Sequence, residues 1–186
     1  MRYSRRGVLK GIAALAGAGA VAACTSVTKN GVTTISLNVA EIDNYAQAGL
    51  SAEQMIMSIA PIAALIPAPI ATAITTDTKI LVGALDSFKA ATKGLLTVDY
   101  DNTDWNTRVN SVLSSIQTVE SDLVAALKSV DGKVSVAFTI DANTALSALS
   151  TLIAFFKAEI GYLGAEKDAK MSKDQAFKIL GIKAPL

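Results

Sequence analysis

The residues between 105 and 130 carry the most regular apolar pattern in the chain. Apolar side chains recur there every three or four positions, a spacing that places them on one face of an α-helix. The positions are Trp105, Val109, Val112, Ile116, Val119, Leu123, Leu127 and Val130. This narrow face predicts a helix of about residues 104–130 that packs against other helices. We expect Trp105, at its start, to lie at least partly in the core and not to act as a platform for a ligand.

Further helices are predicted on both sides of this one. Capping signals and apolar faces place them after Asn38, after Ser51, at about 70–93 before Gly94, at about 142–163 and at 173–180. Glu41 and Gln54 each follow a capping residue by three positions, as in a capping box. The predicted fold class is mainly α, a helical bundle of about four to five helices with short extended lead-in segments.

Three short runs of alternating apolar and polar residues each precede a helix. They are 35–39, 96–100 and 134–140, and the strict alternation of Val134, Val136, Phe138 and Ile140 makes the last run the best strand candidate. If the runs pair with one another, the alternative fold is α+β with a small sheet. If they do not pair, they are extended linkers leading into the helices.

The run from Gln54 to Thr76 contains no charged residue. Its length would permit a membrane span, which needs about 20 apolar residues. Pro61, Pro67 and Pro69 argue against one straight helix, because proline interrupts helical hydrogen bonding. We therefore expect two helices that meet in an apolar hairpin inside the core. The alternatives are membrane insertion of the hairpin and a partner-binding surface.

The start of the chain carries a basic motif followed by an uncharged segment. The motif consists of Ser4, Arg5, Arg6, Val8, Leu9 and Lys10, and residues 11–23 are rich in Gly and Ala. It resembles the export signal of bacterial proteins that use the twin-arginine route, with Val8 at a position where that family most often has Phe. At about 1.5 Å per residue the uncharged segment is too short to span a bilayer.

The uncharged segment ends in Val21, Ala22, Ala23 and Cys24. This sequence resembles a lipobox, the cleavage site of bacterial lipoprotein signals. The resemblance implies cleavage before Cys24 and acylation of that residue, and more than one acyl chain gives stable membrane anchoring. Cys24 is also the one cysteine in the chain, so an ordinary cleaved signal would leave a lone exported thiol.

These resemblances imply a domain organisation and a location. Residues 1–23 are expected to be the signal peptide, 24–33 the lipidated N-terminus and tether, and 34–186 a single helical domain. The protein is then exported and lipid-anchored at the periplasmic side. Thr25 follows the cysteine, whereas enteric lipoproteins kept at the inner membrane typically carry Asp there, so the outer membrane is favoured over the inner membrane.

The sequence offers little chemistry for catalysis or for cofactor binding. It contains no His, which removes the commonest general base and metal ligand, and no nucleotide-binding glycine motif. Asp99, Asp101 and Asp104 are close in sequence but lack the glycine and distant Glu of a calcium loop. We predict a solvated connector with helix-capping residues there, and no catalytic, cofactor-binding or metal-binding residues.

The composition narrows the class of partner. The chain counted from Cys24 has 13 Lys and Arg against 16 Asp and Glu, and no cluster of basic residues, so no nucleic-acid binding is expected. The leading hypothesis is a non-enzymatic binding or accessory protein of the cell envelope, attached to the membrane by its lipid and bound to a protein partner or an envelope component. The alternative is a membrane-active protein, toxin-like or a phage-derived lysis or exclusion protein, that inserts the 54–76 hairpin.

Overall fold

The computed structural model describes residues 24–29, 32–161 and 165–183, with side chains described from residue 35 onward. Four long helices make up most of it: α1 (Val39–Met57), α3 (Ala68–Thr92), α4 (Thr103–Val130) and α5 (Val136–Glu159). The remaining elements are β1 (Cys24–Lys29), β2 (Val32–Asn38), α2 (Ala60–Ala63), β3 (Thr97–Asp99), the short 3₁₀ helix η3 (Ala165–Asp168) and α6 (Lys173–Ile179). The prediction of a mainly α bundle is therefore confirmed.

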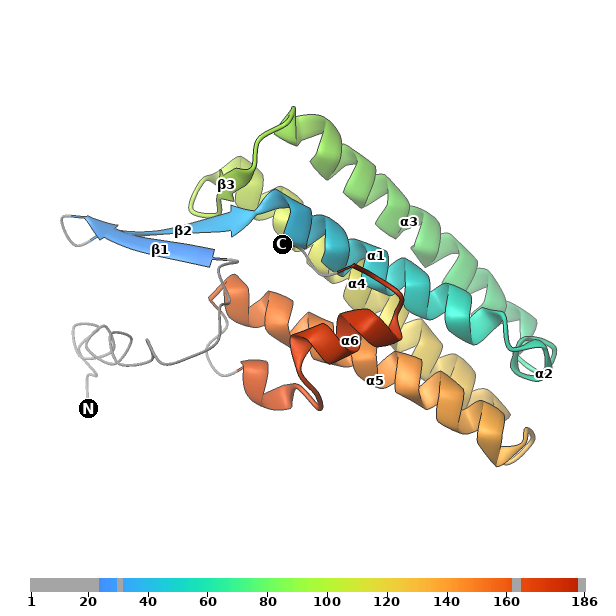
Figure 1. Ribbon diagram of the computed structural model, residues 1–186. Helices are drawn as coiled ribbons and strands as arrows, with labels where there is room; N and C mark the ends of the chain where they lie inside the picture. Colours follow the sequence, from blue (N-terminus) through green and yellow to red (C-terminus); the bar gives the residue numbers. More distant parts are fainter. Residues whose placement is uncertain (1–23, 30–31, 162–164, 184–186) are drawn as a thin grey trace, which may run out of the picture.

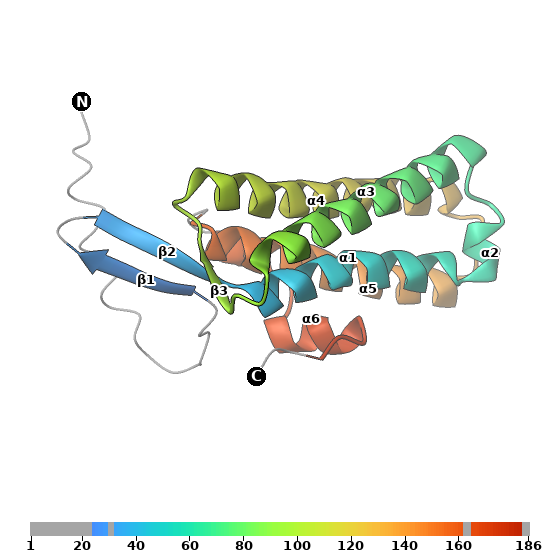
Figure 2. The same cartoon turned by 90° about the horizontal axis from the view of Figure 1, so that it is seen from above.

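The long helices run along one another, with the small sheet at one end of the bundle and α2 at the other (Figures 1 and 2). α4 packs against α1, α3 and α5, and α6 packs on α5. We call the end that carries β1–β3 the sheet end, and the end that carries α2 and the turn between α4 and α5 the far end. α4 has 28 residues, so the two ends lie about 42 Å apart at 1.5 Å per residue.

The apolar face predicted for residues 105–130 is the inner face of α4. Its central residues Val112, Ile116 and Val119 are buried, while Trp105 and Leu127 are partly buried at its two ends. Trp105 packs edge-on against Phe88 of α3, with ring centroids 6.1 Å apart. The partial burial predicted for Trp105 is confirmed.

α1 lies close to α3 and α4 at Gly49. A Cβ atom added there would lie 2.8 Å from Leu81 Cδ2 and 3.5 Å from Ile116 Cγ2. Leu81 and Ile116 are both buried, so neither side chain has open space into which it can move. The missing side chain of Gly49 therefore lets three helices meet inside the bundle.

Two of the three alternating runs form the small sheet. β2 pairs antiparallel with β1 and with β3, in the order β1-β2-β3. Leu37 stands opposite Cys24 on one side and opposite Val98 on the other. The α+β alternative is thus correct to the extent of one three-stranded sheet, and the segment expected to be a tether contains β1.

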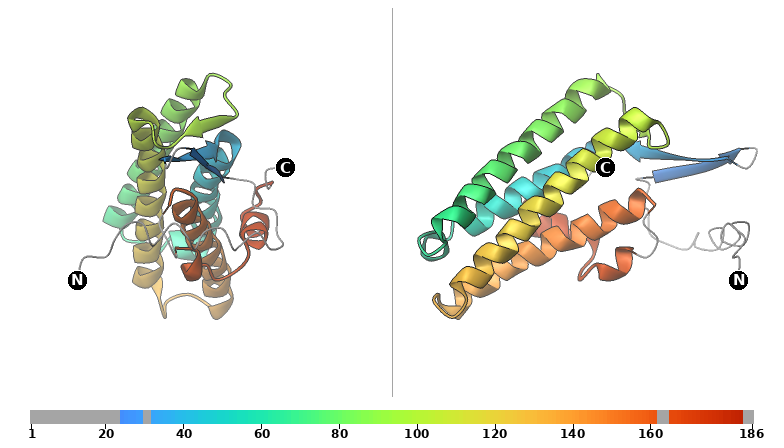
Figure 3. Two further views of the ribbon diagram at one scale, coloured as in Figure 1. Left: turned by 90° about the vertical axis from the view of Figure 1, so that its left-hand side faces the viewer. Right: turned by 180° about the vertical axis from the view of Figure 1, so that it is seen from behind.

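The strand predicted at Val134–Ile140 is wrong. Helix α5 begins at Val136, directly after the turn at residues 131–133. The sheet lies at the opposite end of the bundle, so no strand is available to pair with this segment (Figure 3). Its alternating apolar residues are instead distributed around the first turns of the helix, where Val136 and Ile140 are exposed by 74% and 59%.

The helix boundaries follow the predicted signals with two exceptions, at Ser51 and at the start of α5. The side chains of Asn38, Asn102 and Ser172 cap α1, α4 and α6, and Ser172 forms a capping box with Gln175. Ser51 starts no new helix, because α1 continues through it to Met57. α3 ends as expected before Gly94, and α5 begins six residues before the predicted 142.

The uncharged segment 54–76 forms a proline-broken turn at the far end of the bundle. Pro61 lies in the first turn of α2, and Pro67 and Pro69 lie at the start of α3. Four of its six isoleucines are buried, Ile56, Ile62, Ile66 and Ile74, while Met55 and Leu65 are 38% and 44% exposed. The predicted hairpin is confirmed, but its complete burial in the core is wrong, because one side faces solvent.

In the described part of the chain, α5 is the one helix that is long and apolar enough to cross a membrane by length and composition. Of its most apolar stretch, 39% is buried inside the fold, and core helices of soluble proteins share this composition.

Two glycine substitutions test the close packing at α1. Alanine in place of glycine inside a helix is worth roughly 0.5–1 kcal/mol when the site has room. Gly83→Ala, on the exposed side of α3 with nothing within 4 Å of the added Cβ, should raise the free energy of unfolding by about this amount. Gly49→Ala should gain nothing or lower it, because the added methyl meets Leu81. Urea unfolding followed by circular dichroism measures both, and an equal gain at the two positions would contradict the packing.

Candidate functional site

The most unusual chemistry in the described structure is a cluster of charged side chains in the core. Lys173 of α6 forms ion pairs with Glu41 of α1 and with Glu159 of α5, the latter over 2.7 Å. The Tyr45 hydroxyl donates a hydrogen bond to Glu159 Oε1 over 2.5 Å and lies 3.3 Å from Glu41 Oε1. We call these four residues the buried charge cluster.

Aromatic rings enclose the cluster on one side. The Tyr45 ring stacks on Phe156 with centroids 4.7 Å apart and touches Phe177 at 5.8 Å. The Lys173 ammonium lies 5.2 Å from the Tyr45 ring centroid, within the range of a cation–π interaction. Tyr45, Phe156 and Phe177 are each 1% exposed, so the ion pairs form in an environment with little water.

The charge balance of the cluster favours an added proton. Among the described side chains, two carboxylates share one ammonium, so full ionisation would place two negative charges beside one positive charge in the core, which is costly. Burial raises the pKa of Glu159 to about 7, and the hydrogen bond from Tyr45 opposes that rise. Near neutral pH Glu159 is therefore partly protonated, and Lys173 then balances Glu41.

The cluster fixes the C-terminal part of the chain to the bundle. It joins α1, α5 and α6 through side chains that are far apart in sequence, such as Tyr45 and Glu159, 114 residues apart. The segment before α6 is held as well, because the Lys170 backbone N–H donates to the Thr151 hydroxyl over 3.2 Å. The geometry is that of a clamp. A pocket at the far end of the bundle and another between α3 and α4 are both lined by other residues.

Glu41 has a different role from the one its spacing suggests. It stands three residues after the cap Asn38, but it is 3% exposed and turned into the core toward Lys173. The sequence therefore signals a capping box where the structure has a buried ion pair. The sequence does contain a sign that Glu41 is buried. Glu41 precedes the buried Ile42 and lies one helical turn before Tyr45, on the apolar face of α1.

A second pair of carboxyl groups meets between α3 and α4. Burial, together with the hydrogen bond and the negative charge of Asp77, raises the pKa of Asp122 to about 6. Asp122 is therefore partly protonated in slightly acidic solution. Sequence spacing gave no sign of this pair, because its members lie on different helices.

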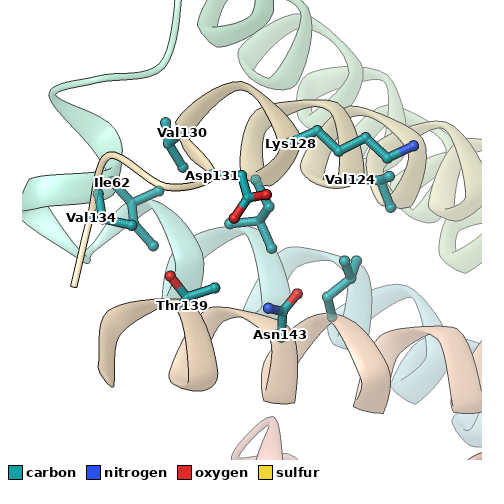
Figure 4. Close-up of a pocket in the computed structure, with 10 residues that line it drawn as sticks. Ile62, Val124, Lys128, Val130, Asp131, Val134, Thr139 and Asn143 are labelled. Carbon is teal, nitrogen blue, oxygen red and sulfur yellow. The ribbon is translucent and has the colours of Figure 1, made fainter. Parts of the chain in front are cut away.

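An open pocket of about 270 Å³ lies at the far end of the bundle. Residues from α2, the end of α4, the following turn and the start of α5 line it, and Figure 4 shows Thr139 and Asn143 pointing from α5 toward α4. Ile62, Val124 and Leu146 supply apolar lining, and Asp131 lies at the rim beside Lys128.

The surface around this pocket exposes several large apolar side chains. Val136, Phe138 and Ile140 of α5 are 74%, 39% and 59% exposed, and Leu65 follows α2 at the same end. We call the pocket and these side chains the far-end surface. Three of its residues, Val136, Phe138 and Ile140, lie in the segment for which the sequence predicted a strand. This surface was therefore not identified from the sequence.

The sequence-predicted signal residues are mostly outside the described structure. Ser4, Arg5, Arg6, Val8, Leu9 and Lys10, and the lipobox residues Val21, Ala22 and Ala23, all lie outside the described residues. Cys24 is the first residue of β1, and its backbone pairs with Leu37 at the sheet end.

The acidic residues near α4 have separate structural partners. Asp99 accepts a hydrogen bond from the Ser36 hydroxyl, and Asp101 accepts one from the Ile35 backbone N–H. Asp104 lies in the first turn of α4, where negative charge stabilises the helix dipole. Within the described residues no three metal-ligating side chains come together.

Comparison with protein-family models, with curated proteins and with solved structures gives no match to this chain.

Removal of the Lys173 ammonium tests the clamp. Lys173→Met removes the ammonium that pairs with both Glu41 and Glu159, and removing one partner of a buried ion pair typically costs about 3–5 kcal/mol. We expect a large drop in the free energy of unfolding in urea and early proteolytic cleavage near α6. Lys178→Met, at an exposed position of α6, is the matched control and should change little. Equal stability of the two variants would show that the cluster does not hold α6.

The raised pKa of Glu159 predicts a specific pH dependence. Between its ordinary value of 4.5 and about 7, the folded protein holds a proton that the unfolded chain has released. The stabilisation from this proton is thus complete at low pH and is lost as the pH rises through that range. Glu159→Gln mimics the protonated form, so its stability relative to the natural chain should increase from pH 5 to pH 8. Glu166→Gln, at an exposed position of η3, should show no such trend in the same urea titrations, and a flat difference for Glu159→Gln would refute the assignment.

Proposed function

We propose that this chain is an exported lipoprotein, anchored through Cys24 at the periplasmic side of a membrane, that acts as a non-enzymatic binding or accessory protein of the cell envelope. The outer membrane is the preferred location, because Thr25 and not Asp follows Cys24. Export by the twin-arginine route is part of the proposal and rests on Arg5 and Arg6.

The observation that supports the binding function is the far-end surface, which lies at the end of the bundle opposite Cys24. Cys24 begins β1 at the sheet end, whereas the far-end surface combines an open pocket with several exposed large apolar side chains. The length of α4, about 42 Å, separates the two. An anchored end and an apolar end at this distance suit a protein that presents a binding surface away from its own membrane.

The membrane-active alternative receives less support from the packing. Insertion of residues 54–76 would have to withdraw Ile56, Ile62 and Ile74 from the core, where they are at most 1% exposed. Extracting such side chains is costly, since each contributes roughly 1.5–3 kcal/mol through burial. Leakage of a vesicle-trapped dye caused by the folded protein would favour this alternative instead.

Two variants test export and anchoring. Replacing both Arg5 and Arg6 by Lys keeps the charge but removes the guanidinium pair, so uncleaved precursor should accumulate inside the cell. Cys24→Ala should abolish acylation and either stall processing or release a soluble form. Intact mass of the membrane fraction provides the measurement. Unchanged membrane attachment of Cys24→Ala would remove the lipid anchor from the account.

Site-specific crosslinking tests the binding surface. A photoreactive amino acid at Phe138 should give one defined crosslinked band in intact envelopes. The same group at Ile80, an exposed position on α3 between the two ends, should not give that band. The pair Val136→Asp and Ile140→Asp should weaken the Phe138 crosslink, because charge opposes burial of this surface in a complex. Equal crosslinking from Phe138 and Ile80 would count against a partner at the far end.

A further inference from the structure

A second exposed apolar patch lies at the sheet end, in the turn between α3 and β3. Leu96 is 84% exposed and Leu95 is 51% exposed. The turn is held in place on both sides: the Leu95 N–H donates to the Thr92 carbonyl over 2.8 Å, and the Leu96 carbonyl accepts from the Val39 N–H over 3.0 Å. The two leucines are therefore presented to solvent by a fixed turn.

The backbone of this turn leaves α3 in a left-handed conformation. Lys93 and Gly94 both have positive φ angles, 45° and 87°, which end α3 before the chain enters β3. A left-handed conformation is unfavourable for lysine. The two leucines that follow are exposed and are not among the buried residues of the core.

The sheet register brings this turn close to Cys24. Cys24 pairs with Leu37, and Leu37 pairs with Val98, two residues after Leu96. Neighbouring strands are about 4.8 Å apart, so Leu96 lies roughly 10–15 Å from Cys24 along the backbone framework. A lipid on Cys24 would therefore hold the membrane surface within reach of both leucines.

We infer that Leu95 and Leu96 insert into the surface of the membrane to which Cys24 is anchored, and so set the bundle's orientation with the far end directed away. The inference rests on the proposed function, because it requires the acylated Cys24. Leucines in a short turn reach the boundary between headgroups and acyl chains, where apolar groups of peripheral proteins are buried.

The charged groups around the turn are compatible with a headgroup environment. Lys93 is exposed next to the leucines, and Lys89, one turn earlier, is paired with Asp43 over 2.7 Å. Asp99 and Asp101 are engaged by Ser36 and the Ile35 backbone. The β1–β2 hairpin extends from the same end (Figure 1), and its strands are rich in Ser and Thr.

Site-specific fluorescence tests the inference on the acylated, full-length mature protein. Acylation consumes the thiol of Cys24, so Leu96→Cys supplies a unique site for an environment-sensitive dye. The labelled protein is reconstituted in phosphatidylcholine vesicles with and without a lipid that carries a nitroxide near its headgroup. Val136→Cys, 74% exposed at the far end, is the matched control, and Leu95→Cys is a second probe of the turn.

We expect quenching at positions 95 and 96 to exceed that at position 136 by roughly twofold or more, since only buried probes approach the nitroxide. Quenching that is equal at the two ends, stronger at position 136 or absent at both would overturn the inference while leaving the anchor intact. Intact mass of the same samples separates the two claims: a mass without acyl groups would overturn the lipid anchor and this inference together.

Discussion

The continuous apolar face of α4 is the surface on which the other long helices assemble. Val112, Ile116 and Val119 are buried along it, and α1, α3 and α5 all contact this helix. The absence of a side chain at Gly49 lets α1 approach Ile116 and Leu81 at the same level. α1 also contacts α3 and α5, so α1 and α4 together form the centre of the bundle on which α3 and α5 pack.

Polar interactions then fix the parts that apolar packing alone does not specify. Lys173 joins the short α6 to α1 and α5, and its two carboxylate partners are satisfied only with the help of Tyr45 and a proton. α6 has seven residues, too few to be a stable helix by itself. The buried charge cluster therefore specifies where the C-terminal segment lies, and the pH dependence of Glu159 is a consequence of using ions for that purpose.

Features encoded locally were predicted from the sequence, and features that depend on distant contacts were not. The face of α4 and the caps Asn38, Asn102 and Ser172 were predictable, because helical periodicity and side-chain caps act within a few residues. The helix at Val136–Ile140 was not predictable, because an alternating pattern of apolar residues does not show whether a partner strand is available. The buried charge cluster, the Asp77–Asp122 pair and the far-end surface combine residues from separate helices, which a single sequence does not align. The export signal and lipobox remain predictions.

We propose that the sheet end of the elongated bundle is held at the membrane and that the far end is presented away from it. Neutron reflectometry on a supported bilayer carrying the acylated protein measures the thickness of the protein layer directly. The account predicts a layer of about 40 Å, close to the length of α4. A layer of roughly 20–25 Å, the width of two packed helices, would show that the bundle lies flat and would contradict the claim.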